Sequence, residues 1–562
     1  MALVTINASA GKTRSSCSCV TAPFLDASVL TEVCSDEPIL QQGSHPIEAP
    51  GKGRSYGQIL KSSALVGGSQ VVNIAIGIVR TKAMAILLGP SGFGLFGLYG
   101  SVADLTQSIA GLGINSSGVR QIAEASATGD TMQMARTAAV LRRISLVLGI
   151  LGAAFLLCFS RLVSRVTFGS ADHASAVAML SIAVLFRLIS AGQGALIQGN
   201  RRIADLARMS VLSALFGLLS SIPLVYFFRD KGVVPSLVVV AAAMILTSWW
   251  YSRKLTLPSA VVSLSQVRQE ASAFLKLGSA FMASGFLTMG AAYVIRITVL
   301  HKVGSEAMGL YQSAWMLGGF YVGIVLQAMG ADFYPRLTAS IKDHIESNRL
   351  VNEQTLIGIL VAGPGVLATL AFAPLVISLL YSARFGGAVG VLRWICLGAT
   401  LQVITWPMGF IIIAKGKQAF FIFSELAWTI VAIALAWLCV TRYGVNGAGI
   451  AFFLSYVFHG IVTYPIVYHL TGFRWSAENK HQGTIFFVLI ATIFASVYVL
   501  PMVWAAGLGC FAALASAAYS ARMILKLISP DQVPRQLRGL LAVTKLHPPF
   551  NFVVRLLRFN NE

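Results

Sequence analysis

The chain has 562 residues, of which 56% are hydrophobic and only 11% charged, and its mean hydropathy is +0.75. A soluble protein of this length carries charge on about a quarter of its residues, so soluble enzymes, secreted modules and fibrous proteins are excluded. The net charge of +21 comes with no RNA-binding motif, and short cytoplasmic loops of membrane proteins are rich in Lys and Arg. We therefore expect an all-α polytopic membrane protein that binds no nucleic acid.

The N-terminal segment and the cysteines predict no further function. Residues 1–58 contain no apolar run long enough for a span or a signal sequence, and their mixed polar composition predicts a disordered cytoplasmic tail. The seven cysteines form an odd set without a CxxC pair, so neither a disulfide framework nor a metal site is expected. The nearest match to a Walker A loop, AGKT at 10–13, has Ile6 in place of the first glycine, which argues against an ATP-driven exporter.

Apolar segments of about 20 residues, long enough to cross about 30 Å of hydrocarbon, follow one another after the tail. About fourteen transmembrane helices are expected, with centres near Asn73, Asp104, Ile150, Arg187, Gly217, Ala242, Gly285, Phe320, Val366, Val403, Ile430, Val457, Ala491 and Ala512. We expect a first six-helix bundle at 59–255, a cytoplasmic linker at 256–272, a second six-helix bundle at 273–470, a C-terminal two-helix hairpin at 482–523 and a basic cytoplasmic tail at 524–562.

The distribution of Lys and Arg predicts the orientation. Thirty of them fall on the side of the N-terminal tail and nine on the other side. Arg187, Arg296 and Arg393 fall within spans, which accounts for all 42. Because basic residues gather on the inner side of a membrane, both termini are expected in the cytoplasm.

The two bundles repeat one another at nearly one offset. The matching pairs are Arg80 with Arg296, Gly89 with Gly304, Arg120 with Arg336, Gly199 with Gly416 and Gly232 with Gly444. Six spans separate the copies, so both have the same orientation and a pseudo-two-fold axis along the membrane normal is expected. In transporters built this way the substrate site lies between the halves, and access alternates as they rock. The last two spans lie outside the repeat.

Three strings carry a resemblance to a known family: GGSQVVNIAIGIVRTKAMAILLGPSGFGLFGLY from residue 67, SIAGLGINSSGVRQIAEA from residue 108 and GADFYPRLTA from residue 330. They resemble the Wzx-type O-antigen and polysaccharide flippases of the multidrug/oligosaccharidyl-lipid/polysaccharide (MOP) exporter superfamily, and the similarity extends to the end of the second bundle. The N-terminal tail departs from the pattern, since such flippases begin close to their first span.

The resemblance implies a transporter of the bacterial inner membrane, without enzymatic activity or cofactor. Its substrate would be an undecaprenyl-diphosphate-linked oligosaccharide, an O-antigen or exopolysaccharide repeat unit, which moves from the cytoplasmic to the periplasmic leaflet by alternating access. Besides this substrate and the membrane lipids, a glycan polymerase and a chain-length regulator are implied as partners.

A lipid diphosphate needs fixed cations inside the membrane, because desolvating an unpaired charge costs several kcal/mol or more. Arginine suits this role, since it stays charged and presents two parallel donors to phosphate oxygens. Arg80 and Arg296 are expected to face each other across the central cavity, and the resemblance implies diphosphate-binding arginines on these helices. The alternative is that both extend to the outer interface. Arg187 is a further candidate ligand or a structural partner of Asp104.

Asp104 is the acid deepest within a span, and the resemblance makes it a candidate for cation coupling. Candidates for a cytoplasmic access or gate region are Arg120, Arg336, Glu124 and Asp332, although basic residues at this side also serve as positive-inside anchors. Glu425 is expected at the membrane interface. Aromatic candidates for stacking on sugars, or for packing, are Trp315, Tyr321 and Trp406.

Two related transporters remain as alternatives. A multidrug (MATE-type) antiporter shares the twelve-helix repeat but needs an acidic cavity for organic cations, so Asp104 favours it and the arginines oppose it. A lipid II flippase has fourteen spans as well. A membrane glycosyltransferase or polymerase is disfavoured, because the outer loops are short and poor in acidic residues.

Overall fold

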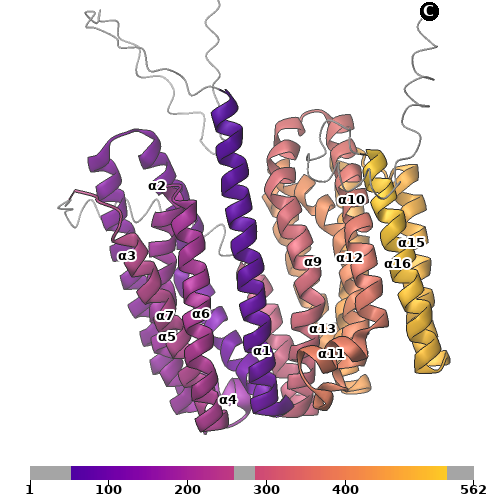
Figure 1. Ribbon diagram of the computed structural model, residues 1–562, viewed down its shortest axis with the longest axis horizontal. Coiled ribbons are helices and arrows are strands. Elements are labelled where there is room, and N and C mark those ends of the chain that lie inside the picture. Colours follow the sequence, from indigo (N-terminus) through magenta and orange to yellow (C-terminus); the bar gives the residue numbers. More distant parts are fainter. Residues whose placement is uncertain (1–51, 259–284, 528–562) are drawn as a thin grey trace, which may run out of the picture. The chain divides into compact units, whose positions relative to one another are not determined.

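The computed structural model describes residues 52–258 and 285–527, with side chains from residue 68 onward except for several between 320 and 332. The described chain is helical throughout, without strands, so the predicted all-α fold is confirmed (Figure 1). Most of the predicted N-terminal tail, linker and C-terminal tail lies outside the described residues. The first helix begins at Lys52, inside the segment that was expected to be a tail.

The first half consists of α1 (Lys52–Gly111), α2 (Ile114–Ala127), α3 (Thr131–Cys158), α4 (Ser160–Phe168), α5 (Ala174–Gly199), α6 (Ile203–Phe228), the 3₁₀ turn η1 (Arg229–Gly232) and α7 (Val233–Ser252). The second half begins with the helix Gly285–Val303 and continues with α9 (Ser305–Ser340), α10 (His344–Ala371), α11 (Ala373–Leu380), η2 (Ala383–Phe385), α12 (Ala388–Ala414), α13 (Gln418–Tyr443) and α14 (Asn446–Thr471). The C-terminal pair is α15 (Ala477–Val499) and α16 (Met502–Leu527).

Among the described residues, 11 helical segments are long and apolar enough to cross a membrane. Two of them contain two crossings each. The segment Gly68–Gly111 reverses at Gly89, whose φ of 65° is not helical. Arg80 consequently lies over the ring of Phe96, 5.7 Å from Cζ to the centroid, whereas a straight helix would separate them by about 24 Å. The segment Ile203–Ser252 reverses at η1. With α9 as a further crossing, the fourteen predicted crossings are present.

The helix corners confirm the repeat and correct two of its matches. Gly89 and Gly304 both have positive φ, and each ends the first crossing of its half. Arg229 ends α6 with φ 50° and ψ −129°, and Gly444 ends α13 with φ 60° and ψ −144°. These pairs share an offset of 215, so matching Gly232 with Gly444 was wrong. Left-handed φ is unusual for residues other than glycine, and a search for repeated glycines therefore missed Arg229.

The next corner shows the same shift. Arg201 has φ 55° and Gly416 has φ 67°. Their backbone N–H groups donate to equivalent carbonyls three residues back, on Gln198 and Ile413. Gly416 therefore corresponds to Arg201 rather than to Gly199. The two halves therefore repeat the backbone geometry of their corners. At two of these corners the first half has arginine where the second half has glycine.

The helices that follow the second crossing of each half begin with the same cap. The carboxylate of Asp130 accepts the N–H groups of Met132 and Gln133 at the start of α3. Asp343 does the same for Ile345 and Glu346 at the start of α10. Such a cap contributes about 1 kcal/mol to helix stability.

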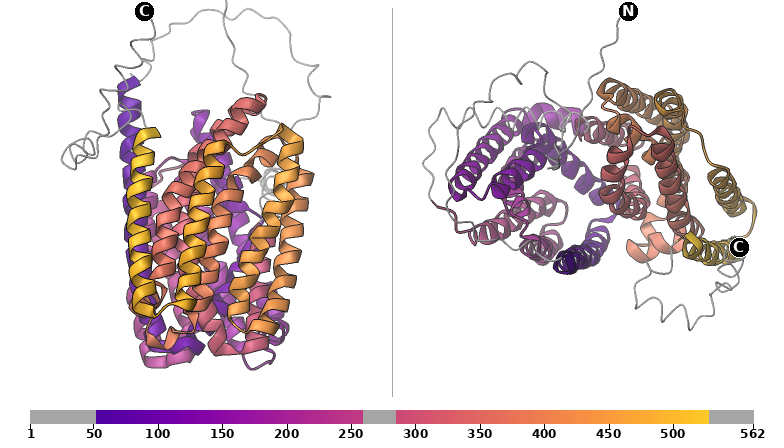
Figure 2. Two further views of the ribbon diagram at one scale, coloured as in Figure 1. Left: turned by 90° about the vertical axis from the view of Figure 1, so that its right-hand side faces the viewer. Right: turned by 90° about the horizontal axis from the view of Figure 1, so that it is seen from above.

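The C-terminal pair packs on the outside of the second half. Both α15 and α16 contact α10 (Figure 2). Glycines permit this approach, because a Cβ at Gly363 would meet the ring of Phe486 and a Cβ at Gly509 would meet Ala371. As predicted, the two helices have no counterpart in the first half.

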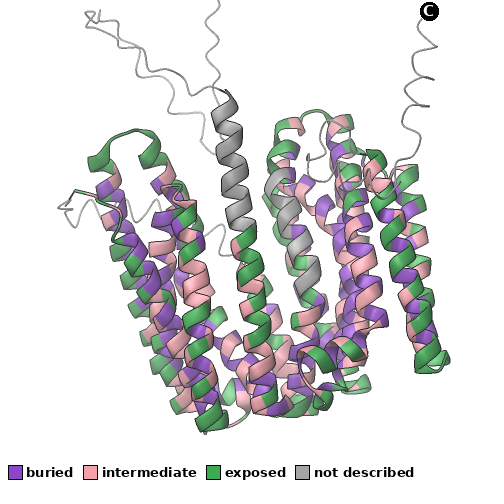
Figure 3. Ribbon diagram, in the orientation of Figure 1, coloured by how far each residue is buried: buried purple, intermediate pink, exposed green. Residues whose placement is uncertain are grey.

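Large apolar side chains are exposed along the helices. Leu151 of α3, Phe227 of α6 and Phe423 of α13 have more than half of their surface exposed (Figure 3). In water such a surface would aggregate, whereas in a bilayer it contacts lipid. The chain is therefore a multi-pass membrane protein.

Candidate functional site

The two halves meet at the end of the helices that carries the corners Gly89 and Gly304, which we call the Gly89 end. A Cβ on Gly94 would lie 2.8 Å from the backbone N of Gly309, and one on Gly309 would overlap the carbonyl of Pro90. The hydroxyls of Ser91 and Ser305 are 3.1 Å apart. The absence of side chains at Gly94 and Gly309 thus allows α1 and α9 to touch backbone to backbone.

A second contact at the Gly89 end involves α4. The hydroxyls of Thr167 and Tyr293 are 2.6 Å apart, and Nε2 of His301 lies 3.1 Å from the carbonyl oxygen of Thr167. These hydrogen bonds join the first half to the helix Gly285–Val303. Together with the glycine contact they hold the halves together at this end.

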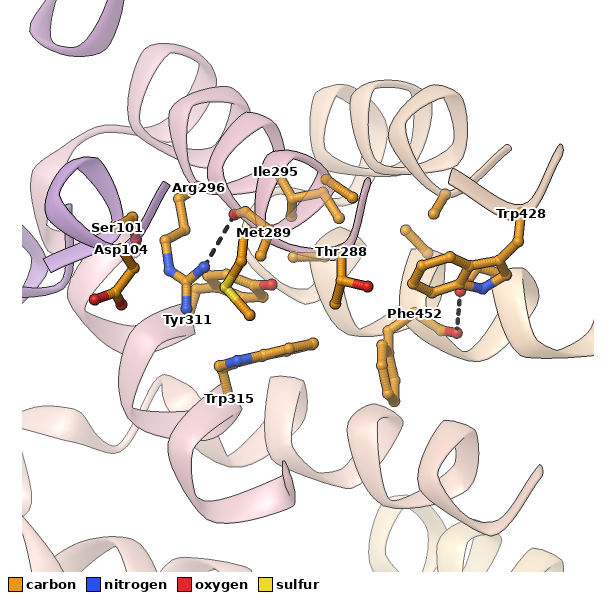
Figure 4. A pocket seen from close by; sticks show the side chains of 16 residues that line it. Ser101, Asp104, Thr288, Met289, Ile295, Arg296, Tyr311, Trp315, Trp428 and Phe452 are labelled. Atoms are coloured by element: carbon orange, nitrogen blue, oxygen red, sulfur yellow. Dashed lines mark hydrogen bonds between the residues drawn. The ribbon is translucent and has the colours of Figure 1, made fainter. Parts of the chain in front are cut away.

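A cavity of about 250 Å³ lies between the halves. Asp104 of α1 lines it from the first half, and Arg296 lines it from the helix Gly285–Val303. Aromatic side chains complete the wall: Tyr311, Trp315, Trp428 and Phe452 (Figure 4). A cavity with aromatic walls and few charged groups is typical of a ligand site.

Arg296 is held in place by its neighbours. Its Nε donates to Oε1 of Gln312 at 2.9 Å, and its Nη1 donates to the carbonyl of Ala292 at 3.1 Å. Its Cζ lies 6.0 Å from the ring centroid of Trp315. A guanidinium has five N–H donors, so donors remain for a ligand in the cavity. A fixed cation of this kind suits a phosphate or carboxylate.

Asp104 and Arg187 form an ion pair, an arrangement that the sequence left open. Nη1 of Arg187 lies 2.6 Å from Oδ1 of Asp104, and their side chains are 15% and 55% exposed. Asp104 also interacts electrostatically with Arg296. Arg187 and Arg296 carry two positive charges against the one negative charge of Asp104, so this group of three side chains is net positive.

Arg80 does not line this cavity. Its Nε donates to the hydroxyl of Ser221 on α6 at 3.2 Å, its ring neighbour is Phe96, and its Nη2 is buried without a hydrogen-bond partner among the described residues. The expectation that Arg80 faces Arg296 across the cavity stays a prediction. The corner offset of 215 pairs Arg80 with Ile295, one residue before Arg296, and Ile295 also lines the cavity.

The expected gate residues lie on exposed helix faces. Arg120 pairs with Glu124 within α2 at 2.8 Å, and both side chains are more than half exposed. Arg336 is exposed on α9 and interacts electrostatically with Glu346. The side chain of Asp332 lies outside the described residues.

The structure adds two neighbours of Arg296 that the sequence analysis did not select. Gln312 accepts a hydrogen bond from Arg296 and orients it, and Tyr311 is fully buried and lines the cavity. With the corner offset of 215, Phe96 beside Arg80 corresponds to Tyr311, and this match is the signal that could have revealed Tyr311 beside Arg296. Among the suggested aromatics, Trp315 lines this cavity and Trp406 lines a neighbouring one. The side chain of Tyr321 lies outside the described residues.

Glu425, for which an interfacial position is predicted, lies two turns into α13 on the wall of the cavity that Trp406 lines. Among the described residues, no group of three or more His, Cys, Asp or Glu side chains is arranged to hold a metal ion.

Two repeated bundles with a cavity between them are the architecture of a membrane transporter. The family described as polysaccharide biosynthesis protein matches residues 83–390, more than half of the chain. The chain therefore belongs to this family of polysaccharide biosynthesis proteins.

Individual relatives agree with this assignment. The chain is 21% identical over 407 residues to a lipid III flippase of Escherichia coli (strain K12), covering 71% of this chain and 95% of the relative. A lipid II flippase, MurJ, in an inward closed conformation has a TM-score of 0.63 at 14% identity, covering 82% and 99% of the two chains. An inward-facing multidrug resistance MATE transporter of the MOP superfamily has a TM-score of 0.55 at 17% identity, covering 71% and 98%. The fold is thus that of the MOP superfamily, and these relatives are transporters rather than enzymes.

Proposed function

We propose that the protein is a flippase that moves a lipid-diphosphate-linked oligosaccharide across the bacterial inner membrane. The main support is Arg296, a fixed cation with unused donors in a cavity between the two halves. A diphosphate is a doubly charged ligand that needs such a partner away from water. An O-antigen or exopolysaccharide repeat unit on undecaprenyl diphosphate is the proposed substrate, and the resemblance to Wzx-type flippases and the similarity to a lipid III flippase support it.

The proposed orientation in the membrane rests on the distribution of charge. We infer that the Gly89 end faces the periplasm and that both termini are cytoplasmic, because the excess of Lys and Arg falls at the opposite end. With the halves in contact at the Gly89 end, the described arrangement corresponds to a state closed toward the periplasm. A substrate would enter from the cytoplasmic leaflet, and rocking of the halves would open the other end. A glycan polymerase and a chain-length regulator remain the proposed downstream partners.

The antiporter alternative is weakened by the pairing of Asp104. An antiporter of organic cations needs a carboxylate that can exchange its cation for another. Here the Asp104 carboxylate forms an ion pair with Arg187 at 2.6 Å, and the guanidinium compensates its negative charge. The same pairing weakens the hypothesis that Asp104 carries a coupling ion.

The test is complementation of a bacterial strain that lacks its own O-antigen flippase, with surface glycan as the readout at matched membrane levels. Wild-type protein should restore glycan. Arg296→Ala should reduce it by about tenfold or more, since loss of a charged hydrogen-bonding partner costs about 1.5–3 kcal/mol. Arg208→Ala, which removes an exposed arginine of α6, is the matched control and should leave glycan unchanged.

Two other results would contradict part of the proposal. Glycan that survives Arg296→Ala would contradict the diphosphate assignment but keep the flippase. If the wild type restores no glycan, even with several donor glycans, while the cells gain resistance to cationic drugs, the antiporter alternative is correct.

A further inference from the structure

A second cavity, of about 310 Å³, adjoins the Arg296 cavity within the second half. The two cavities share Thr288 and Trp428 as lining residues. Trp428 stands on the side of the first cavity that is away from Arg296 (Figure 4). A ligand held at one end by Arg296 can therefore extend past Trp428 into the second cavity.

The walls of the second cavity are aromatic. Trp406 and Phe410 come from α12, Trp428 from α13 and Tyr456 from α14. The rings of Trp406 and Phe410 meet at 70° with centroids 4.5 Å apart. Flat ring faces provide large, rigid contact surfaces, which fit the apolar C–H faces of a pyranose ring.

Polar groups lie between the rings. Gln402 is hydrogen-bonded to the hydroxyl of Tyr456, and Glu425 makes no ion pair among the described residues. Nε1 of Trp428 and Nδ1 of His459 are buried without a hydrogen-bond partner in the described part of the chain. Buried polar atoms are almost always paired, so these two are available to a polar ligand that enters the cavity.

A neighbouring hollow shows that this mixture of groups is specific to the second cavity. A hollow of about 30 Å³ between α10, α12, α14 and α15 is lined by aliphatic and phenyl side chains, with Thr400 as its one polar side chain. Generic packing of apolar helices leaves hollows of that kind. The second cavity, by contrast, combines aromatic faces with an amide, a carboxylate and an imidazole, as a site for a ligand rich in hydroxyl groups requires.

We propose that the second cavity binds the sugar attached to the diphosphate and selects neutral or N-acetylated sugars over acidic ones. This inference rests on the proposed flippase function. The sugar stacks on Trp428 and donates its hydroxyl or amide hydrogens to Glu425, while Nε1 of Trp428 donates to a sugar oxygen. A uronic acid would bring its carboxylate close to that of Glu425, and like charges in a cavity repel one another strongly.

The experiment measures binding of three defined probes to the purified full-length protein in nanodiscs. The probes are polyprenyl diphosphate, the same lipid linked to N-acetylglucosamine, and the same lipid linked to glucuronic acid. The wild type should bind the N-acetylglucosamine probe about tenfold more tightly than the bare diphosphate, a difference typical of one or two good contacts. The glucuronic acid probe should bind no more tightly than the bare diphosphate.

Variants assign the selectivity to the cavity. Glu425→Gln should bring the affinity for the glucuronic acid probe up to that for the N-acetylglucosamine probe. Trp428→Ala should lose the gain from the sugar, with Trp428→Phe as a milder variant in case the first one does not fold. Trp437→Ala, which removes an exposed tryptophan of the same helix α13, and Glu353→Gln, at an exposed acid of α10, are the matched controls and should bind as the wild type does.

The contrary outcomes are distinguishable. Equal wild-type affinity for the bare and sugar-linked probes would overturn the sugar site and leave the proposed function intact. Failure to bind any diphosphate probe would defeat the proposed function and this inference with it. If Glu425→Gln abolishes Na⁺ binding without altering sugar preference, the cavity is a cation site and the inference is wrong.

Discussion

Arg187 and Asp104 bury their charges to different extents, and this asymmetry predicts how each responds to substitution. The side chain of Arg187 is 15% exposed and that of Asp104 is 55% exposed. Asp104→Asn leaves a largely buried guanidinium unpaired and should destabilise the protein by about 2 kcal/mol, whereas Arg187→Gln leaves a half-exposed carboxylate and should cost about 1 kcal/mol. The double variant should be more stable than Asp104→Asn alone. The free energies of unfolding of the wild type, the two single variants and the double variant, measured in detergent, give the coupling between the two residues. Additive effects of the two single substitutions would contradict the pairing.

The two repeat-related arginines have different surroundings, although the position equivalent to Arg80 in the second half, Ile295, lines the cavity beside Arg296. The glycine and arginine phrases in the sequence were sufficient to predict the spans, the repeat and the arginine in the cavity. The offset between Arg80 and Arg296 is 216, one residue more than the corner offset of 215. The sequence could not show this difference, because a shift of one residue does not change the hydrophobic pattern of a fully apolar helix. The contact of Gln312 and the cavity position of Glu425 were missed for a related reason, since tertiary packing decides which face of such a helix meets a cavity.

The contacts of Arg296 predict the outcome of an exchange. Ile295→Arg with Arg296→Ile keeps the composition but turns the guanidinium by about 100°, away from Gln312 and the carbonyl of Ala292, which hold Arg296 in place. Position 295 also lines the cavity, so the exchange keeps an arginine at the cavity but removes its fixed partners, and glycan export should fall in the same complementation assay. The exchange Val294→Ile with Ile295→Val moves no charge and serves as the control. Full export by the arginine exchange would mean that the position of Arg296 is unimportant.

The contact of α1 with α9 predicts a cross-link between the halves. The hydroxyls of Ser91 and Ser305 are 3.1 Å apart, within reach of a disulfide if both residues are replaced by cysteine. In a Cys158→Ser background, Ser91→Cys with Ser305→Cys should cross-link under mild oxidation and block glycan export until a reductant is added. Each single cysteine variant is a control and should export glycan under both conditions.

A second change tests whether the same contact depends on glycine. Gly309→Leu would overlap the carbonyl of Pro90, whereas Gly319→Leu on the same helix meets no atom within 4 Å of its Cβ. The first change should prevent the cross-link and the second should not. A cross-link that forms equally in both would show that the halves do not close through the glycine pair.

At the scale of the whole molecule, the exposed apolar side chains indicate that the protein lies in a membrane, and the distribution of Lys and Arg indicates its orientation there. The exposed leucines and phenylalanines indicate that lipid surrounds the helices, but they do not distinguish one membrane face from the other. Only the Lys and Arg at one end distinguish the faces, so orientation depends on a different set of residues from fold and is tested separately.

The orientation can be tested by labelling cysteines, and a native cysteine already serves as the labelling site at the Gly89 end. Cys158 is exposed at the end of α3, close in sequence to α4, which contributes to the contact of the halves. With Cys17, Cys19, Cys34 and Cys510 replaced by Ser, a membrane-impermeant maleimide should label Cys158 in intact spheroplasts. Lys417→Cys at the opposite end, with Cys158→Ser added to this background, should be labelled only after the membrane is permeabilised. Cys396 and Cys439 are buried and should stay unlabelled in both conditions. Labelling of Cys158 only after permeabilisation would invert the proposed orientation, and the state described here would then be closed toward the cytoplasm.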